Sequence, residues 1–447
     1  MAAARSCATN VNGLLTDLYE LTMAAGYFEA GKSSQKATFE LSIRRLPSHR
    51  NFIIAAGLER CVAYLLGLRF GAEEIEYLRG LAQFAGVSAA FFEYLRDFRF
   101  TGDLFAVPEG TPLFAGEPMM TLRAPLIEAQ IPETYLLSSI TFQSLIATKA
   151  ARMVEMSHGR DVVEFGTRRA HTPEAGVLGA RAAYIGGCAG TSNTLAGMRF
   201  GIPVFGTAAH SWVLSFCSEQ ESFRQLQKLL GTQTVQLIDT YDTIAGARRA
   251  AELGPPLWGV RLDSGNIVEL SRQVRAILDG AGLDESKIMA TGDLDEYKIR
   301  EIVNAGAPVD AFGVGTELAT SADAPSMGTV YKLVELDISG IKRFTAKFSE
   351  DKATLPGAKQ LFRRPDRDIL GRAGECCSGS EALLQPVILN GTVVEDLPDV
   401  KTAQARTREC VKKLSPALRS LEVSDPYPVE YSKDLAALIE RTRRNLA

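Results

Sequence analysis

The spacing of hydrophobic residues predicts both helices and strands in the first 160 residues. Apolar residues recur with a helical period over residues 14–31 and alternate with polar ones over residues 36–47, which is typical of a half-buried strand. Three further segments have the helical pattern: residues 52–68, 72–82 and 89–98. Residues 102–125 are short apolar runs separated by Gly and Pro, which predicts a small strand-rich unit, and a long helical stretch over residues 126–156 follows it.

A regular alternation of short strands and helices begins after residue 160. Helical patterns over residues 266–282 and 294–306 separate some of the apolar runs. Six runs have the length and apolar character of buried strands: residues 161–165, 202–206, 235–239, 258–263, 287–292 and 311–316. Strands that alternate with helices indicate parallel β/α units, and either a barrel or an open doubly wound sheet would satisfy this pattern.

Polar residues gather where these six runs end. The carboxyl ends of parallel strands meet at one edge of a sheet, and β/α barrels build their active sites there. We therefore expect a functional site at this edge. The polar strand ends are residues 164–168, 207–210, 239–242, 261–263, 292–293 and 313–316.

The pattern divides the chain into three segments. Residues 1–125 are expected to form an N-terminal α/β domain, and residues 126–344 a catalytic β/α barrel. From about residue 330 the pattern returns to strands, and a polar, less periodic tail follows. We expect residues 345–447 to form a C-terminal extension that packs back on the N-terminal domain, which would make that domain discontinuous.

The composition excludes several classes of protein. With 46% apolar residues and a formal net charge of −4, the chain can bury a large core and has no overall attraction for nucleic acid or anionic lipid. No uninterrupted apolar stretch approaches the ~18 residues of a membrane span, and the first residues lack a signal peptide's apolar core. The seven cysteines are scattered, without zinc-site spacing. We expect a cytoplasmic protein that binds neither nucleic acid nor membranes.

His210 is one of only four histidines and follows the small residues of the sequence FGTAAHS. Its residue type and position leave three interpretations: a hydrogen-bonded core histidine, a metal ligand, or a nucleophile or acid–base group at a strand end. No second histidine or cysteine is spaced to share a metal with it. The small neighbours would leave room for a large substrate.

Two glycine turns and an arginine point to an anionic ligand. Gly313, Gly315 and the preceding turn at Gly292 could present backbone N–H groups to phosphate. Arg261 ends an apolar strand, so it needs an anionic partner, which is either Asp263 or a substrate. By pattern alone, the aromatic Tyr19 on the N-terminal helix is expected to be a core residue.

Six motifs occur along the chain in this order: LLTDLYE, EFGTRRA, FGTAAHS, GVRLDSG, AFGVGTEL and VYKL. Together they resemble the motifs of the nicotinate phosphoribosyltransferases, in that family's order, and the similarity covers roughly residues 13 to 350. The resemblance implies an irregular, TIM-like β/α barrel joined to an α/β domain built from both chain ends. It also implies conversion of nicotinate and phosphoribosyl pyrophosphate (PRPP), coupled to ATP hydrolysis, into nicotinate mononucleotide, as the first step of NAD synthesis from nicotinate.

The resemblance gives each candidate residue a role. His210 would be phosphorylated and couple ATP to turnover. Tyr19 would stack on the pyridine ring from the neighbouring subunit of a homodimer, with Phe165 on the opposite face, which replaces the core interpretation of Tyr19. The remaining residues fall into three groups: Thr207, Arg261 and Arg168 for nicotinate; Asp263, Gly292, Asp293, Gly313, Gly315 and Thr316 for PRPP; and Asp239 or Asp242 as candidate Mg²⁺ ligands. Lys332 is a further candidate residue without an assigned role.

The substrate is expected to be nicotinate rather than nicotinamide. The related nicotinamide enzymes carry an acid where this chain has Asn193, and an acid would repel a carboxylate. A carboxylate facing Arg261 would also gain a charge-assisted hydrogen bond.

Two other functions predict different residues at the strand ends. A barrel aldolase or isomerase would need a Schiff-base lysine or a paired acid and base at the strand ends, and no lysine ends any of the six runs. A non-catalytic sensor of pyridine nucleotides would be expected to lack a nucleophile or a phosphate ligand. His210, Arg261 and Thr316 are all present in this chain.

Overall fold

The computed structural model describes residues 12–348 and 353–446, which divide into two compact units. Unit 1 comprises the described residues up to Ser144, Ser326–Pro398 and those from Val423 onward. Unit 2 comprises Leu145–Pro325 and Asp399–Glu422. Within the described residues, no helix is both long enough and apolar enough to cross a membrane.

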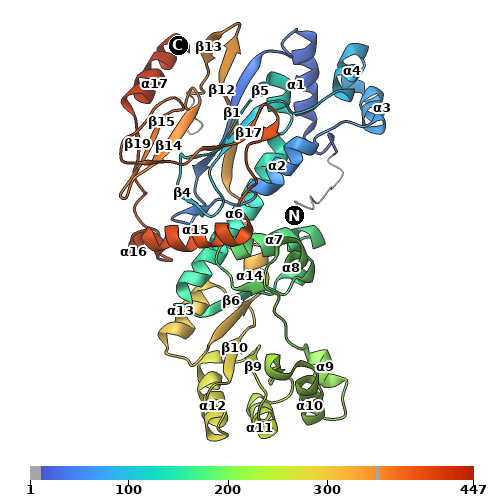
Figure 1. Ribbon diagram of the computed structural model, residues 1–447, viewed down its shortest axis with the longest axis vertical. Helices are drawn as coiled ribbons and strands as arrows, with labels where there is room; N and C mark the ends of the chain where they lie inside the picture. Colours follow the sequence, from blue (N-terminus) through green and yellow to red (C-terminus); the bar gives the residue numbers. More distant parts are fainter. Residues whose placement is uncertain (1–11, 349–352, 447) are drawn as a thin grey trace. The chain divides into compact units, whose positions relative to one another are not determined.

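Unit 2 is built on a six-stranded parallel sheet with the order β7-β6-β11-β10-β9-β8 (Figure 1). The last strand, β11, pairs with the first, β6, which is the pairing that closes a β/α barrel. A parallel bridge between Thr191 and Val204 continues the sheet beyond β7. The sheet is therefore that of an irregular barrel. Its strands are β6 (Asp161–Glu164), β7 (Gly190–Thr191), β8 (Val235–Leu237), β9 (Gly259–Leu262), β10 (Lys287–Ala290) and β11 (Ala311–Val314).

Helices alternate with these strands. At the start of several helices, the side chain of the N-cap residue accepts a hydrogen bond from the backbone N–H three residues later. The strands are almost wholly apolar because both faces of the sheet are covered. The helices of unit 2 are α7 (Pro173–Ile185), α8 (Thr194–Phe200), α9 (His210–Leu214), α10 (Glu219–Leu230), α11 (Thr243–Leu253), α12 (Ile267–Gly280), α13 (Glu296–Asn304), α14 (Thr316–Ala319), α15 (Val400–Lys413) and α16 (Pro416–Arg419), with 3₁₀ turns η2 (Thr167–Arg169) and η3 (Gly231–Gln233).

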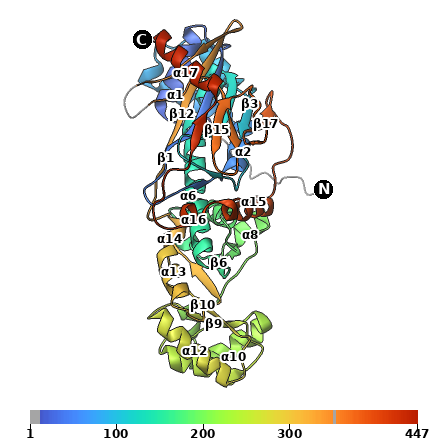
Figure 2. The ribbon, with the colours of Figure 1, turned by 90° about the vertical axis from the view of Figure 1, so that its left-hand side faces the viewer.

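Unit 1 contains a seven-stranded antiparallel sheet with the order β13-β12-β1-β5-β3-β17-β18. Strand β12, from beyond the barrel, pairs with β1, and β17 pairs with β3 (Figure 2), so both ends of the chain form one sheet. The strands are β1 (Lys36–Arg45), β3 (Asp103–Ala106), β5 (Pro118–Pro125), β12 (Gly328–Ile338), β13 (Ile341–Phe344), β17 (Gln385–Leu389) and β18 (Thr392–Val393).

Smaller elements complete unit 1. The second sheet has the order β16-β14-β15-β19, and β2 pairs with β4. Their strands are β2 (Ile53–Ile54), β4 (Pro112–Leu113), β14 (Lys359–Arg363), β15 (Asp368–Arg372), β16 (Glu381–Ala382) and β19 (Val429–Tyr431). The helices are α1 (Leu18–Glu29), α2 (Leu58–Gly67), α3 (Ala72–Gly80), α4 (Ala89–Arg96), α5 (Leu126–Gln130) and α17 (Lys433–Leu446), with the 3₁₀ turn η1 (Ala82–Phe84).

The structure differs from the expected elements in several places. The segment 52–68, expected to be helical throughout, begins with β2, and α2 starts only at Leu58. The helical stretch over residues 126–156 is two helices, α5 and α6 (Glu133–Met156), because Pro132 has no N–H to continue the first. The run 202–206 forms a single bridge rather than a strand, since Pro203 cannot donate to a ladder. The units divide at residues 144/145 and 325/326 instead of 125/126 and 344/345, and Asp399–Glu422 groups with unit 2.

Candidate active site

Polar side chains from successive strand ends of unit 2 contact one another at the carboxyl edge of the sheet. Each belongs to a segment that directly follows, or ends, a strand or the Val204 bridge. The residues joined by these contacts are Thr207, His210, Asp239, Thr240, Arg261, Asp263, Ser264 and Thr291. Ser264 and Thr291 were not predicted, and Thr240 was included only as part of the polar strand end 239–242. Their only sequence signal is their position just after a strand.

His210 is the first residue of α9 and is not a core histidine. Its Nδ1 lies 3.1 Å from the Thr240 hydroxyl oxygen, and its Nε2 lies 3.7 Å from a carboxylate oxygen of Asp263. The imidazole side chain is 42% exposed. The backbone before it is open, since a Cβ on Gly206 would have no neighbour within 4 Å. An accessible imidazole beside a carboxylate is suited to act as a nucleophile.

Arg261 lies at the end of β9 with most of its side chain buried. Its guanidinium donates to the Thr207 hydroxyl and lies 3.5 Å from the Ala208 carbonyl oxygen and 3.6 Å from a carboxylate oxygen of Asp263. Its buried Nε has no hydrogen-bond acceptor among the described residues. Burial lowers the pKa of Arg261, against the opposing effect of the Asp263 charge. A buried cation with an unused N–H group is suited to hold an anionic ligand.

Asp239 and Asp263 form an acidic pair beside this arginine. One Asp239 oxygen accepts from the backbone N–H of Asp263 (3.0 Å) and from the Ser264 hydroxyl (2.6 Å). The Thr291 hydroxyl donates to Asp263, so three strand ends are tied together. The second oxygen of Asp239 is buried and has no protein partner among the described residues.

The two candidate magnesium ligands differ in their surroundings. Asp242 caps α11, with its carboxylate accepting the backbone N–H of Ala245 at 2.7 Å. Asp239 keeps the free oxygen described above. No group of three His, Cys, Asp or Glu residues in the described ranges is arranged to hold a metal. Mg²⁺ commonly takes one or two carboxylates and completes its shell with phosphate oxygens and water, so Asp239 alone fits such a role.

The turn after β10 requires glycine. Gly292 has a φ of +91°, and a Cβ there would lie 2.1 Å from the backbone carbonyl oxygen of Asp263. Asp293, the next residue, has a φ of +46°, in the left-handed region. The Lys298 amine holds the Asp293 carbonyl oxygen at 2.7 Å. This turn therefore lies against the end of β9, beside the acidic pair.

The turn after β11 lies next to it. A Cβ on Gly313 would lie 2.5 Å from the methyl group of Thr291 and 2.7 Å from the Phe165 ring. Gly315 is the N-cap residue of α14, and Thr316 is the first helical residue. Both glycine turns thus meet at adjacent strand ends, where β10 and β11 pair.

The end of β6 is anchored by a buried carboxylate that the sequence did not single out. Glu164 accepts from the backbone N–H of Gly166 and, at 2.5 Å, from the Thr191 hydroxyl. Burial raises the pKa of Glu164. The adjacent Phe165 ring packs on a buried cluster of apolar strand residues, and Arg168 is exposed on η2. Glu164 therefore fixes the loop that carries both predicted residues.

Asn193 lies at the same edge, and both ends of its side-chain amide form hydrogen bonds within the protein. Its amide oxygen accepts the backbone N–H of Ala196 at 2.9 Å and so caps α8. Its NH₂ group donates to the Thr167 hydroxyl at 3.1 Å.

Tyr19 lies in unit 1, on α1, and is not a core residue. It is 47% exposed, and Leu18 and Met23 of the same helix and Leu15, which precedes the helix, are exposed with it. Partial burial raises the pKa of the phenol, as does its interaction with Glu20. The tyrosine therefore belongs to an exposed apolar face of unit 1.

A polar group lies behind this face. Gln130 donates to the carboxylates of Glu20 (2.8 Å) and Glu133 (3.1 Å), and the Lys332 amine lies 3.7 Å from Glu133. Burial raises the pKa of Glu20 to about 7.

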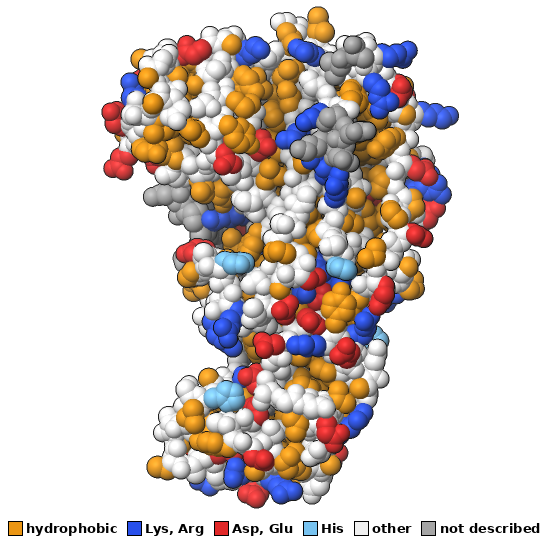
Figure 3. Space-filling view, turned by 180° about the vertical axis from the view of Figure 1, so that it is seen from behind, with side chains coloured by type: hydrophobic (Ala, Val, Ile, Leu, Met, Phe, Trp, Pro, Cys, Tyr) orange, Lys and Arg blue, Asp and Glu red, His pale blue; other side chains and the backbone are white. Residues whose placement is uncertain are grey.

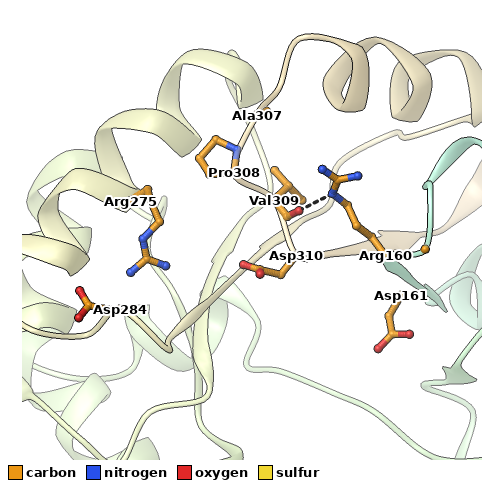
Figure 4. Close-up of a pocket in the computed structure, with 9 residues that line it drawn as sticks. Arg160, Asp161, Arg275, Asp284, Ala307, Pro308, Val309 and Asp310 are labelled. Carbon is orange, nitrogen blue, oxygen red and sulfur yellow. Dashed lines mark hydrogen bonds between the residues drawn. The ribbon is translucent and has the colours of Figure 1, made fainter.

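A cleft at the opposite, amino-terminal edge of the barrel strands is a different kind of region (Figure 4). The Arg160 Nε donates to the Val309 carbonyl oxygen at 2.8 Å, and Asp310 accepts the backbone N–H of Ile288 at 2.8 Å. Arg275 donates to two backbone carbonyls. These charged groups satisfy the backbone, so the cleft supports the fold and is not the candidate site. On the face shown in Figure 3, acidic and basic side chains are interspersed.

Comparison with known proteins gives a consistent result along the chain. The N-terminal domain of the nicotinate phosphoribosyltransferase (NAPRTase) family matches residues 14–141, the NAPRTase family domain matches residues 161–347, and the family's C-terminal domain matches residues 377–439. Together these matches span most of the sequence.

Individual relatives agree. Nicotinate phosphoribosyltransferase pncB2 of Mycobacterium tuberculosis is 44% identical, covering 97% of this chain and 94% of the relative. Nicotinate phosphoribosyltransferase of Bacillus subtilis is 43% identical over 78% of this chain and 72% of its own. The crystal structure of human nicotinic acid phosphoribosyltransferase matches with a TM-score of 0.81 and 29% identity, over 96% of this chain and 100% of that one. The chain belongs to the nicotinate phosphoribosyltransferase family.

Proposed function

We propose that this member of the family joins nicotinate to the phosphoribosyl group of PRPP and couples the transfer to ATP hydrolysis. The overall reaction is nicotinate + PRPP + ATP + water giving nicotinate mononucleotide + pyrophosphate + ADP + phosphate. The pyridine nitrogen attacks C1 of the ribose, and the bond from C1 to the pyrophosphate oxygen breaks. This reaction commits nicotinate to NAD synthesis.

Nicotinate would bind at the ends of β6 and β9. Arg261 and the Thr207 hydroxyl hold its carboxylate, which supplies the anion that the buried guanidinium needs. Phe165 lies against one face of the ring, and Arg168 lies close enough to add positive charge. The opposite face is covered by Tyr19 of the partner subunit in a homodimer, and the exposed apolar face around Tyr19 supports this assignment.

PRPP would lie along the glycine turns after β10 and β11. The turns bring backbone close to a ligand because no Cβ intervenes. Asp263 and Asp293 hold the ribose hydroxyls, and the free oxygen of Asp239 is the protein ligand of Mg²⁺. When bound, Mg²⁺ neutralises charge on the departing pyrophosphate. The residues of this site are Asp263, Gly292, Asp293, Gly313, Gly315 and Thr316.

His210 is the energy-coupling residue. A neutral imidazole nitrogen attacks the γ-phosphorus of ATP, ADP leaves, and water later hydrolyses the phosphohistidine to phosphate. The phosphorylated ring, set beside the PRPP site, biases binding and release toward product.

The observation that carries this proposal is the set of contacts linking His210, Arg261 and the turn after β10. Asp263 lies within 3.7 Å of the imidazole and 3.6 Å of the guanidinium, and its hydrogen bond with Thr291 reaches the PRPP turn. Nucleophile, carboxylate site and phosphate turn therefore surround a single aspartate.

The test is an assay with nicotinate, PRPP and Mg²⁺, with and without ATP. The wild type should form nicotinate mononucleotide with ATP stimulation and carry an acid-labile, base-stable phosphate. His210→Ala should lose both the phosphate and the stimulation while keeping the ATP-independent rate. Full stimulation in His210→Ala, or turnover of nicotinamide in place of nicotinate, would contradict the proposal.

We also place the protein in the cytoplasm. None of the cysteines in the described part of the chain forms a disulfide, which suits a reducing compartment.

A further inference from the structure

Unit 2 contains a cluster of four charged residues, three of them buried, that takes no part in the contacts of the candidate active site. Lys149 and Arg152 lie on α6, Glu296 begins α13, and Asp323 follows α14. The side chain of Lys149 is 1% exposed, that of Glu296 0%, and that of Asp323 23%. Two cations and two carboxylates balance, so the cluster, called here the α6 cluster, is neutral overall.

One amine joins two loops. The Lys149 Nζ lies 2.6 Å from an oxygen of Glu296 and 2.7 Å from an oxygen of Asp323. The other oxygen of Glu296 receives the Arg152 Nε at 2.9 Å. Burial alone would raise the pKa of Glu296, but the charges of Lys149 and Arg152 keep it below its usual value, so the carboxylate stays ionised.

Each carboxylate belongs to a segment that follows a glycine turn. Glu296 comes directly after the turn that starts at Gly292, and the helix it begins is α13. Asp323 lies just beyond α14, whose N-cap is Gly315. Lys149 therefore links the two segments that follow the glycine turns.

We propose that Lys149 is a positioning residue that sets the spacing of the two turns that bind PRPP. The inference rests on the proposed function. Buried ion pairs seldom stabilise a fold more than apolar residues of the same size would, so their use here is geometric. A displacement of about 1 Å in such a site can cost about 100-fold in rate.

The experiment compares Lys149→Met and Asp323→Ala with the wild type in steady-state kinetics and in calorimetric binding of PRPP. Asp323→Ala is the milder change because Lys149 retains its ion pair with Glu296. For both variants kcat/KM for PRPP should fall, by about 100-fold in Lys149→Met and about 10-fold in Asp323→Ala, while KM for nicotinate stays within about 2-fold. Asp323→Asn, which retains an oxygen for the Lys149 amine, should restore most of the loss.

Arg363→Met provides the matched control. Arg363 holds the buried Asp368 at 2.6 Å in unit 1, so its loss also breaks a buried ion pair. It should lower the melting temperature as Lys149→Met does and leave KM for PRPP unchanged.

Loss of thermal stability in Lys149→Met and Asp323→Ala with PRPP affinity and kcat/KM unchanged would overturn the positioning role. Equal losses for nicotinate and PRPP would also overturn it. A wild type that neither binds PRPP nor turns over nicotinate would instead refute the proposed function, so the two failures are distinguishable.

Discussion

Two clusters of charged side chains, one in each unit, accommodate buried carboxylates in different ways. The α6 cluster of unit 2 has two cations for two carboxylates, and its Glu296 stays ionised. The second cluster, in unit 1, has one cation, Arg363, for two fully buried carboxylates, Glu117 and Asp368. Burial and the nearby Asp368 charge raise the pKa of Glu117 well above its usual value.

The two clusters differ in the ratio of cations to carboxylates, and this ratio determines what each cluster does. In unit 1, Arg363 lies 2.6 Å from Asp368 but 3.9 Å from Glu117, so burial and the Asp368 charge favour the protonated form of Glu117. Glu117 accepts the backbone N–H of Phe114 at 2.8 Å and forms a side-chain hydrogen bond with Asp368. In unit 2, four full charges hold fixed distances between three segments. Balanced charge serves geometry, and unbalanced charge is removed by protonation.

The largest expected difference between the clusters concerns amide substitutions. Glu296→Gln should lower the free energy of unfolding by about 3 kcal/mol or more, because two buried cations then share one carboxylate. Glu117→Gln should cost less than about 1 kcal/mol, because the residue replaced is already neutral. Denaturant unfolding of both variants measures this. Equal costs would show that the two clusters do not differ in protonation.

The pH dependence should have opposite sign in the two clusters. The folded-state pKa of Glu296 is lowered, so its contribution is complete above the unfolded pKa of about 4.3 and is lost as pH falls through the folded value. The folded-state pKa of Glu117 is raised, so its contribution is complete below the unfolded pKa and is lost as pH rises through the folded value.

Melting temperatures of wild type, Glu296→Gln and Glu117→Gln from about pH 2 to about pH 9 measure both signs, because the Glu296 contribution is lost only below its unfolded pKa. The stability of the wild type relative to Glu296→Gln should decrease on acidification. Its stability relative to Glu117→Gln should decrease as pH rises. Each change should be at most about 1.4 kcal/mol per pH unit for one proton. Parallel curves for all three proteins would contradict the assigned directions.

The smallest expected effect comes from the edge of the α6 cluster. The Arg152 guanidinium lies 3.4 Å from the Tyr297 hydroxyl, a long contact beside its 2.9 Å bond to Glu296. Tyr297→Phe should therefore cost less than about 1 kcal/mol and leave KM for PRPP unchanged. A large rise in the KM for PRPP would show that the Arg152–Tyr297 contact, and not the contacts of Lys149, positions the turns.

The sequence predicted the barrel strands that are long, apolar runs and missed the shorter one. Strands β6 and β8 to β11 lie within the expected runs, because buried parallel strands are almost wholly apolar. Strand β7 is only Gly190–Thr191, too short to leave a periodic signal. The break between α5 and α6 was predictable from Pro132, since proline interrupts a helix. The apolar pattern, however, continues through Pro132 and gave one long helical segment.

The site was predictable where it follows strand ends and not where it depends on partners distant in sequence. His210 and Arg261 stood out by position, and they do contact the same aspartate. Lys149 lies in a helical pattern where a lysine is expected on the surface. Its partners Glu296 and Asp323 come from far along the chain, and no local pattern predicts such pairing.

The order of strands in unit 2 leaves one seam in the barrel wall. Within the described residues, no ladder joins the Val204 segment to β8, and the backbone amides of residues 206–209 donate to no backbone carbonyl. The stretch leading to His210 thus lies where the wall has the least backbone support. Under the phosphorylation proposed for His210, movement of this stretch would accommodate the added group, while the paired strands that carry Arg261 and the glycine turns keep their register.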